Sequence, residues 1–215
     1  MFKTMIDEKY FIESVNKFKE IEKRANFYDI AREIVDEYPI QACVIILAVW
    51  NVGNFKFVKD REQFLFEFKS TFEECKTLFK KLENLEFRNA DFDAIRDIVK
   101  EIYNRLAKIN GVSYTGASKV MHLVNPNIFV IWDSYISGQK PKKYYKDLEI
   151  VKNYGWKYKK YKRHGDGYIE FLKDLQITFK NINITKGDRT FAKVIDEFNY
   201  VNITLPIQKI LNIRN

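Results

Sequence analysis

Residues 111–133 read GVSYTGASKVMHLVNPNIFVIWD, and this stretch decides the fold because it joins two helical patterns through a turn. The first pattern, residues 92–109, places apolar side chains at helical spacing and runs directly towards Gly111. Glycine readily adopts the left-handed backbone that a tight turn between two helices requires. We expect the second helix to begin near Ser113, whose hydroxyl can cap it.

The second helix is predicted to end at Asn125, because the residue before a proline avoids the α region and Pro126 follows. The apolar run 128–132 comes next and leads directly to Asp133. An aspartate in this position is a candidate catalytic carboxylate. It can equally serve as the N-cap of a helix that starts at Ser134, and the two roles do not exclude one another.

This order of features resembles the helix-hairpin-helix-GPD superfamily of base-excision DNA glycosylases, in particular small prokaryotic proteins with the 8-oxoguanine glycosylase fold. In that superfamily a Gly-Val-Gly hairpin binds a DNA phosphate through backbone N–H groups, and an aspartate further along the chain serves the chemistry. Gly111-Val112-Ser113 corresponds to the hairpin, with Ser113 in place of the second glycine, and Asp133 corresponds to the aspartate. The resemblance implies that the hairpin and the neighbouring Thr115 and Ser118 contact nucleic acid.

The resemblance also bears on strand cleavage. Its lyase-type members carry a nucleophilic lysine four residues after the first hairpin glycine, where this chain has Thr115. Lys119 lies one helical turn later and is the candidate nucleophile if strand cleavage accompanies base removal. The alternative role for Lys119 is that of a surface lysine bound to phosphate or solvent, in which case any glycosylase activity is monofunctional.

A further candidate contact lies earlier in the chain. Residues 40–50 are apolar nearly all round, which is typical of the central helix of a bundle, and they end in Trp50 and Asn51. In the resembling superfamily a helix at this place leads into a loop that probes the DNA beside the extruded base. Trp50 and Asn51 are the candidate base-probing residues; alternatively, Trp50 belongs to the core and Asn51 ends the helix.

The charge of the chain is unevenly distributed. The net charge is +8, but residues 1–110 contain 19 basic and 20 acidic side chains, whereas residues 111–215 contain 18 basic and 9 acidic ones. All of the excess positive charge therefore follows the hairpin. Such an asymmetry indicates a polyanionic partner, and we expect this partner to be DNA, duplex or single-stranded.

Residues 139–163 hold ten of these basic side chains, interleaved with tyrosine and tryptophan and opposed by two acidic residues. Cations for phosphates and flat rings for bases are what a nucleic-acid surface uses. The alternative is a solvated lysine face with the aromatic rings packed inward, and both can hold at once. The predicted DNA contacts in this segment are Lys140, Lys142, Lys143, Lys157, Lys159, Lys160 and Arg163.

The composition favours one compact all-α domain over residues 1–215, built as a two-lobed helical bundle with the hairpin element (about 92–125) where the lobes meet. Glycine and proline are sparse, at 8 and 4, and long segments show helical spacing. No apolar run is long enough to span a membrane, and the first residues lack a secretory pattern. The two cysteines, Cys43 and Cys75, are expected to be reduced thiols of a cytoplasmic monomer.

The sequence supports two functions from different classes. One is a DNA glycosylase, with or without lyase activity, that removes a damaged (oxidised) base with the help of Asp133. The other is a non-catalytic DNA-binding module of the same fold, which the serine at 113 and the threonine at 115 favour. We expect no metal and no cofactor, because the metal, nucleophile-elbow and dinucleotide motifs are absent and His122 and His164 lie far apart in the sequence.

Overall fold

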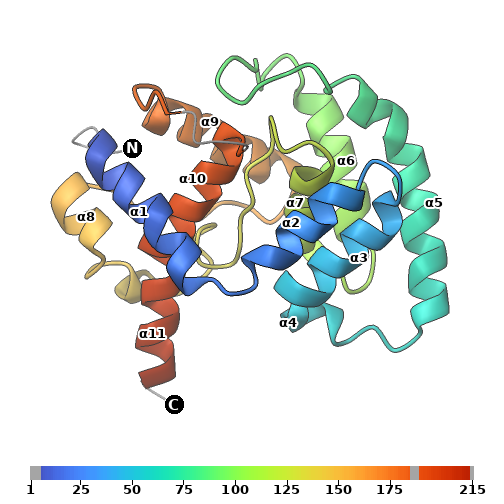
Figure 1. Cartoon of the computed structure of the whole chain (residues 1–215), viewed down its shortest axis with the longest axis horizontal. Coiled ribbons are helices and arrows are strands. Elements are labelled where there is room, and N and C mark those ends of the chain that lie inside the picture. Colours follow the sequence, from blue (N-terminus) through green and yellow to red (C-terminus); the bar gives the residue numbers. More distant parts are fainter. Residues whose placement is uncertain (1–5, 185–188, 214–215) are drawn as a thin grey trace.

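The computed structural model of the chain describes residues 6–184 and 189–213. Within these ranges the chain forms helices and turns without a β-strand, so the predicted all-α fold is confirmed. Two groups of helices lie side by side in Figure 1. None of the helices in the described ranges combines the length and the apolar character that crossing a bilayer requires.

The helices on the right of Figure 1 form the first group. They are α2 (Ala25–Ile34), α3 (Pro39–Trp50), α4 (Val52–Phe55), α5 (Arg61–Lys80), α6 (Arg96–Lys108) and α7 (Ser113–Val124). As predicted, α3 is a central helix: it packs against both α2 and α7, and its Ala42, Cys43, Ile46 and Leu47 are buried.

The second group combines the two ends of the described chain. It contains α1 (Glu8–Ile21), the 3₁₀ helix η1 (Lys142–Tyr144), α8 (Glu149–Tyr154), α10 (Phe191–Asn199), the π-helix η2 (Tyr200–Thr204) and α11 (Leu205–Ile213). Helix α1 packs against α10 and η2. Helix α9 (Gly165–Phe179) packs along α6 and so ties the later part of the chain to the first group.

The turn between α6 and α7 contains two residues with positive φ. Gly111 has φ +89°, as predicted, and a side chain there would collide with Val58, because its Cβ would lie 2.3 Å from a Val58 methyl carbon. Ser113 has φ 58°, an uncommon backbone for a residue other than glycine. The predicted cap by Ser113 is wrong, because no side chain caps the N-terminus of α7. Ser113 instead stands where the backbone itself favours glycine.

The apolar run 128–132 is buried and is held against α7 by two polar side chains. His122 Nδ1 donates to the Phe129 carbonyl oxygen (2.5 Å), and Ser118 Oγ accepts from the Trp132 N–H (3.2 Å). Burial lowers the pKa of His122 to about 3, so the ring is neutral and its Nε2 accepts the Tyr28 hydroxyl (2.9 Å). These bonds fix the start of the segment that carries Asp133.

Candidate functional site

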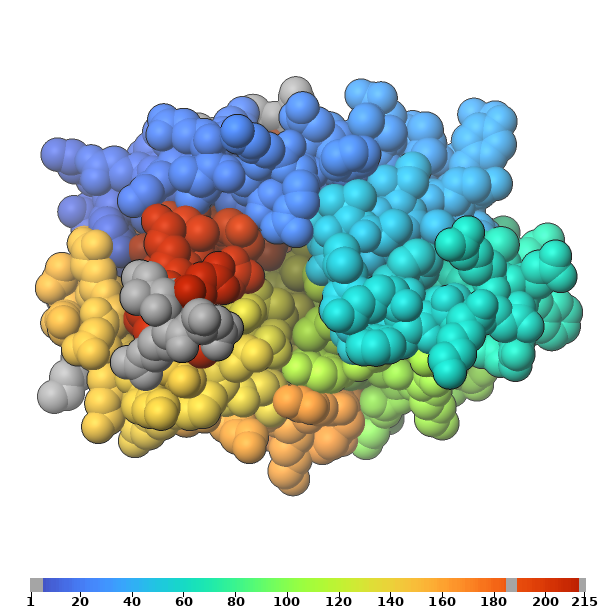
Figure 2. Space-filling view, turned by 90° about the horizontal axis from the view of Figure 1, so that it is seen from below, coloured from blue at the N-terminus to red at the C-terminus, as the bar shows by residue number. Residues whose placement is uncertain are grey.

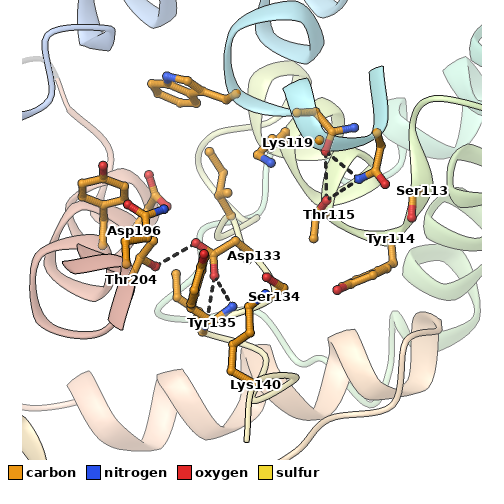
Figure 3. A pocket seen from close by; sticks show the side chains of 18 of the residues that line it. Ser113, Tyr114, Thr115, Lys119, Asp133, Ser134, Tyr135, Lys140, Asp196 and Thr204 are labelled. Atoms are coloured by element: carbon orange, nitrogen blue, oxygen red, sulfur yellow. Dashed lines mark hydrogen bonds between the residues drawn. The ribbon is translucent and has the colours of Figure 1, made fainter. Parts of the chain in front are cut away.

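A pocket of about 620 Å³ opens where the two groups of helices meet. Its walls come from the end of α1, the α3–α4 junction, the first half of α7, residues 131–136 and the α10–η2–α11 segment. The space-filling view in Figure 2 has this hollow near its centre, between the cyan α3–α4 region and the red C-terminal helices. Lys119 and Asp133, the two candidate catalytic residues, both line it (Figure 3).

Asp133 is half-buried and its carboxylate accepts three hydrogen bonds. Oδ1 accepts from the N–H groups of Tyr135 (2.7 Å) and Ile136 (2.8 Å), and Oδ2 accepts from the Thr204 hydroxyl (2.7 Å). Burial raises the pKa of this carboxyl, and the same three donors, together with Lys119, oppose that rise. The N-cap role predicted for Asp133 is wrong, because residues 134–138 form a turn and not the helix expected from Ser134; the carboxylate instead binds two N–H groups of that turn.

Lys119 lies on α7 and is buried, with 6 % of its surface exposed. Burial lowers the pKa of its ammonium to about 8, although Asp133 and Asp196 favour the charged form. Among the described residues its Nζ has neither a hydrogen bond nor an ion pair. The alternative of a surface lysine is therefore wrong. The pocket contains an amine whose charged form is disfavoured by burial.

Three residues predicted to contact nucleic acid are instead buried: Ser118, Gly111 and Thr115, whose hydroxyl donates to Asn51. Ser118 is fully buried, and its hydroxyl lies 2.9 Å from the Thr115 carbonyl oxygen and 3.1 Å from that of Trp132. The prediction of a DNA contact by Ser118 is wrong, because the side chain is enclosed between α7 and the apolar run 128–132, called the connector below. Gly111 is buried against Val58, so it shapes the turn rather than forming its surface.

Asn51 has a structural role at the end of α3. Its amide donates to the carbonyl oxygens of Gly111 (2.9 Å) and Val112 (2.8 Å), and its Oδ1 accepts from the Thr115 hydroxyl (2.9 Å). With 3 % of its surface exposed and its amide committed to the turn, Asn51 cannot probe a base. That prediction is corrected: Asn51 ties α3 to the α6–α7 turn, and Thr115, itself buried, takes part in the same network.

Trp50 is half-buried and lines the pocket. Its ring stacks on Tyr28 with 5.8 Å between the centroids and 6° between the planes. Its indole Nε1 is buried without a hydrogen-bond partner among the described residues. Trp50 thus packs in the core and also presents a ring to the pocket, and a contact with a base stays a prediction.

The rim of the pocket carries two cations, each placed over an aromatic ring. Lys140 Nζ lies 4.8 Å from the centre of the Tyr135 ring, and the Arg163 guanidinium lies 4.7 Å from the centre of the Tyr114 ring. Both cations line the pocket, as does the half-buried Ser113. Three of the predicted nucleic-acid contacts therefore meet at the mouth of the pocket that contains Lys119 and Asp133.

The other predicted contacts, Lys142, Lys143, Lys157, Lys159 and Lys160, are exposed and do not line this pocket. Aromatic residues between them pack inward: the Tyr145 ring lies 4.8 Å from that of Tyr158 and 5.9 Å from that of Trp156. The alternative of solvated lysines over packed rings is confirmed. Contact of these lysines with nucleic acid stays a prediction, which the inward packing of the rings does not oppose.

Sequence reasoning missed the wall formed by α10 and η2. Asp196 lines the pocket while accepting from Lys193 Nζ at 2.9 Å, and Thr204 contacts Asp133 across 71 positions of sequence. Neither residue belongs to a motif, so no local signal could have identified them. Within the described ranges no cluster of three metal-ligating side chains occurs.

Comparisons of the chain with protein-family models, with curated proteins and with solved structures returned no match. A functional assignment for the pocket therefore depends on its own geometry and chemistry.

Proposed function

We propose that the chain binds DNA and removes a damaged, oxidised base by cleaving its N-glycosidic bond, with the pocket receiving the extruded nucleotide. One observation carries the proposal: a buried lysine without a partner in the described chain lines the same pocket as a half-buried carboxylate. Perturbed ionisable groups in a concave site are typical of functional sites.

The shape and charge of the pocket agree with this substrate. A volume of about 620 Å³ is in the range of small-ligand sites, and the half-buried Trp50 supplies aromatic surface to its wall. A nucleotide that enters such a pocket keeps its phosphates at the mouth. Lys140 and Arg163 at the rim supply positive charge there.

The carboxylate of Asp133 suits the bond-breaking step. Cleavage of an N-glycosidic bond develops positive charge on the sugar, and a fixed carboxylate beside it lowers the energy of that state. The same group can instead accept a proton from an attacking water molecule. Its three hydrogen bonds keep it oriented, so little reorganisation is needed when the charge develops.

Lys119 extends the proposal to a lyase. With a pKa of about 8, roughly one-tenth of the amine is unprotonated at pH 7. Its neutral Nζ can attack C1′ of the sugar, so that the Nζ–C1′ bond forms as the bond to the base breaks; the base leaves with the bonding electrons and takes up a proton, and the new ammonium releases one. The nitrogen lone pair then expels O4′ from C1′, O4′ takes up a proton as the ring opens, and the resulting protonated imine is reduced by borohydride to a stable adduct.

The second candidate is a non-catalytic DNA-binding module. The bonds from the N–H groups of Tyr135 and Ile136 to Asp133 favour it, because they give the carboxylate a structural role that needs no chemistry. Thr115 favours it too, since it stands where the resembling lyases carry their nucleophile. This module would bind duplexes through the rim cations without changing them.

The test is an excision screen over duplexes that each contain a different damaged base, with Asp133→Asn as the control. We expect wild-type protein to release at least one oxidised base and Asp133→Asn to lose at least a hundredfold in rate. Borohydride trapping on the excised substrate follows, using Lys119→Met and Lys140→Met. An adduct lost only in Lys119→Met supports the lyase.

The outcomes separate the candidates. Release without an adduct supports a monofunctional glycosylase, and an adduct that survives in Lys119→Met rules out this amine as the nucleophile. Binding without release from any duplex leaves the non-catalytic module. Lys140 is a suitable control because it is a second amine that lines the same pocket.

A further inference from the structure

Thr204 reaches Asp133 from the other group of helices. It is the last residue of η2 and is 1 % exposed, and its hydroxyl donates to Asp133 Oδ2 at 2.7 Å. The other carboxylate oxygen is held by the N–H groups of Tyr135 and Ile136, which belong to the same turn as Asp133. Thr204 is therefore the distant contact that fixes the direction of the carboxylate (Figure 3).

The π-helix is the element that delivers this contact. A π turn holds more residues than an α turn, so the face presented after it is rotated relative to the preceding helix. Such turns are rare inside helices and frequent at functional sites. Here η2 joins α10 to α11, and Tyr200 at its start and Thr204 at its end both line the pocket.

We infer that Thr204 is a positioning residue for the proposed base excision: its hydroxyl orients the Asp133 carboxylate towards the pocket. The inference rests on the proposed function and adds to it a residue from outside the hairpin and the connector. The two walls of the pocket belong to different groups of helices, and the Thr204 bond holds the Asp133 carboxylate to the second of them. This bond keeps the carboxylate in one position relative to both walls.

The hydroxyl acts against the effect of burial. Burial raises the pKa of Asp133, whereas the Thr204 hydroxyl, the N–H groups of the turn and the charge of Lys119 lower it. Removing the hydroxyl leaves burial less opposed, so the carboxyl should protonate at higher pH. The titratable groups that interact with this carboxyl are Lys119 and Tyr114 of α7, Tyr135 of the turn, and Tyr145.

The experiment compares Thr204→Val, which keeps the shape but loses the hydroxyl, with Thr204→Ser, which keeps the hydroxyl. The titration midpoint of the Asp133 carboxyl is followed by ¹³C NMR and assigned with Asp133→Asn. We expect a midpoint higher by about one pH unit in the valine variant and near the wild-type value in the serine variant. The acid limb of the excision rate should move in the same direction and be restored by serine.

Thr190→Val is the matched control, because the Thr190 hydroxyl caps α10 and donates to the Pro126 carbonyl oxygen without touching Asp133. It should lower stability while leaving the midpoint unchanged. An unchanged midpoint in Thr204→Val overturns the inference whether or not excision occurs. A shifted midpoint with an unshifted excision profile overturns the positioning role, and absence of excision by wild-type protein overturns the proposed function itself.

Discussion

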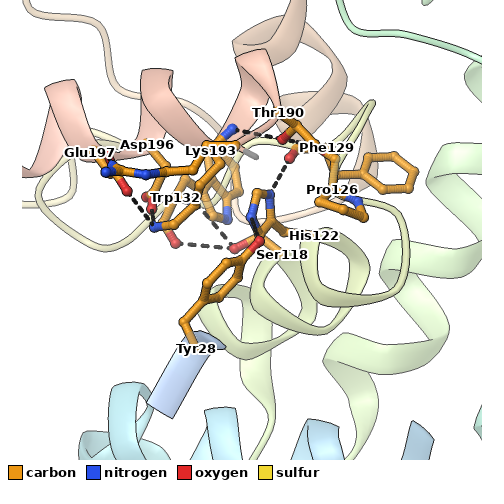
Figure 4. A network of polar contacts seen from close by, with 11 residues as sticks. Tyr28, Ser118, His122, Pro126, Phe129, Trp132, Thr190, Lys193, Asp196 and Glu197 are labelled. Carbon is orange, nitrogen blue, oxygen red and sulfur yellow. Dashed lines mark hydrogen bonds and ion pairs between the residues drawn. The ribbon is translucent and has the colours of Figure 1, made fainter. Parts of the chain in front are cut away.

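Lys119 of α7 and Lys193 of α10 are both buried, with 6 % and 3 % exposed, yet their surroundings act on their charges in opposite directions. Lys193 Nζ lies 2.9 Å from a carboxylate oxygen of Asp196 and 3.7 Å from one of Glu197 (Figure 4). Burial opposes its charge, but these carboxylates outweigh burial and raise its pKa. For Lys119, burial prevails and lowers the pKa to about 8.

Aromatic rings add to the difference between the surroundings of Lys193 and Lys119. Lys193 Nζ lies 4.9 Å from the ring centre of Phe18, 4.7 Å from that of Tyr28 and 5.2 Å from that of Trp50. The carboxylates and the ring faces around Lys193 stabilise its positive charge, and such a buried, paired cation has a structural role. The amine of Lys119 instead lines an open pocket. The comparison teaches that burial alone does not set the direction of a lysine's pKa shift, because close carboxylates reverse it for Lys193 and not for Lys119.

The largest expected effect is a loss of stability on removing Lys193, the lysine that is paired with carboxylates. Lys193→Met should lower the free energy of unfolding by about 3–5 kcal/mol, because it leaves the buried carboxylate of Asp196 without its cation and that of Glu197 with Arg189 alone. Chemical denaturation followed by circular dichroism measures the change. Lys119→Met is the matched control, and it should cost little or add stability, since it removes a charge whose burial Asp133 and Asp196 do not outweigh. Equal losses for the two variants would break the comparison.

The pH dependence of stability is the next largest effect. The pKa of Lys119 is about 8 when folded, against 10.5 for an unperturbed lysine. Below pH 8 both states are protonated and the folded chain bears the whole penalty. Between pH 8 and 10.5 only the unfolded chain keeps the proton, so the free energy of unfolding should rise, relative to Lys119→Met, by about 3 kcal/mol.

Lys193 provides the contrast in the same window. Its pKa is raised, so its stabilising contribution is complete below pH 10.5 and is lost only as the pH rises further. The stability difference between wild type and Lys193→Met should therefore stay constant from pH 8 to 10.5. Urea denaturation at several pH values measures both differences. A flat difference for Lys119→Met would contradict the unpaired state of that amine.

Local chemistry explains what could be predicted from the sequence. Gly111 predicts the turn and Pro126 predicts the end of α7, because each restricts the backbone of its close neighbours. The apolar residues of α3 are nearly continuous, so the helix is predicted to be buried. The position of Asp133 after an apolar connector was likewise readable. The cap predicted at Ser113 is wrong, because the preference of serine for caps does not reveal that the turn places this residue in the left-handed region.

Tertiary contacts explain what could not be predicted. Ser118 and Asn51 are polar residues that face the interior, and the sequence does not tell whether a polar side chain meets solvent or a carbonyl group. Thr204 and Asp196 reach the pocket only because α10 and η2 pack beside it. Lys119 was identified as a candidate, but its lack of a partner became visible only with the fold.

The smallest expected effect concerns DNA binding by exposed lysines, which also differ in whether they form an ion pair. Lys157 and Lys160 are exposed without an ion pair in the described chain, whereas Lys159 Nζ pairs with Asp174 (2.6 Å) and Glu170 (3.7 Å). If these lysines bind duplex phosphates, Lys157→Gln and Lys160→Gln should each reduce the salt dependence of binding by about 0.9 log per log. Fluorescence anisotropy of a labelled duplex at several salt concentrations measures this slope.

Lys159→Gln should reduce the slope less, because its ammonium must leave two carboxylates before it neutralises a phosphate. The difference should be small, since exposed ion pairs contribute only about 0–1 kcal/mol. Lys69→Gln on the exposed side of α5 is the control and should leave the slope unchanged. An effect of Lys69→Gln equal to the others would mean that DNA responds to net charge alone. Unchanged slopes for all three variants would remove Lys157, Lys159 and Lys160 from the binding surface.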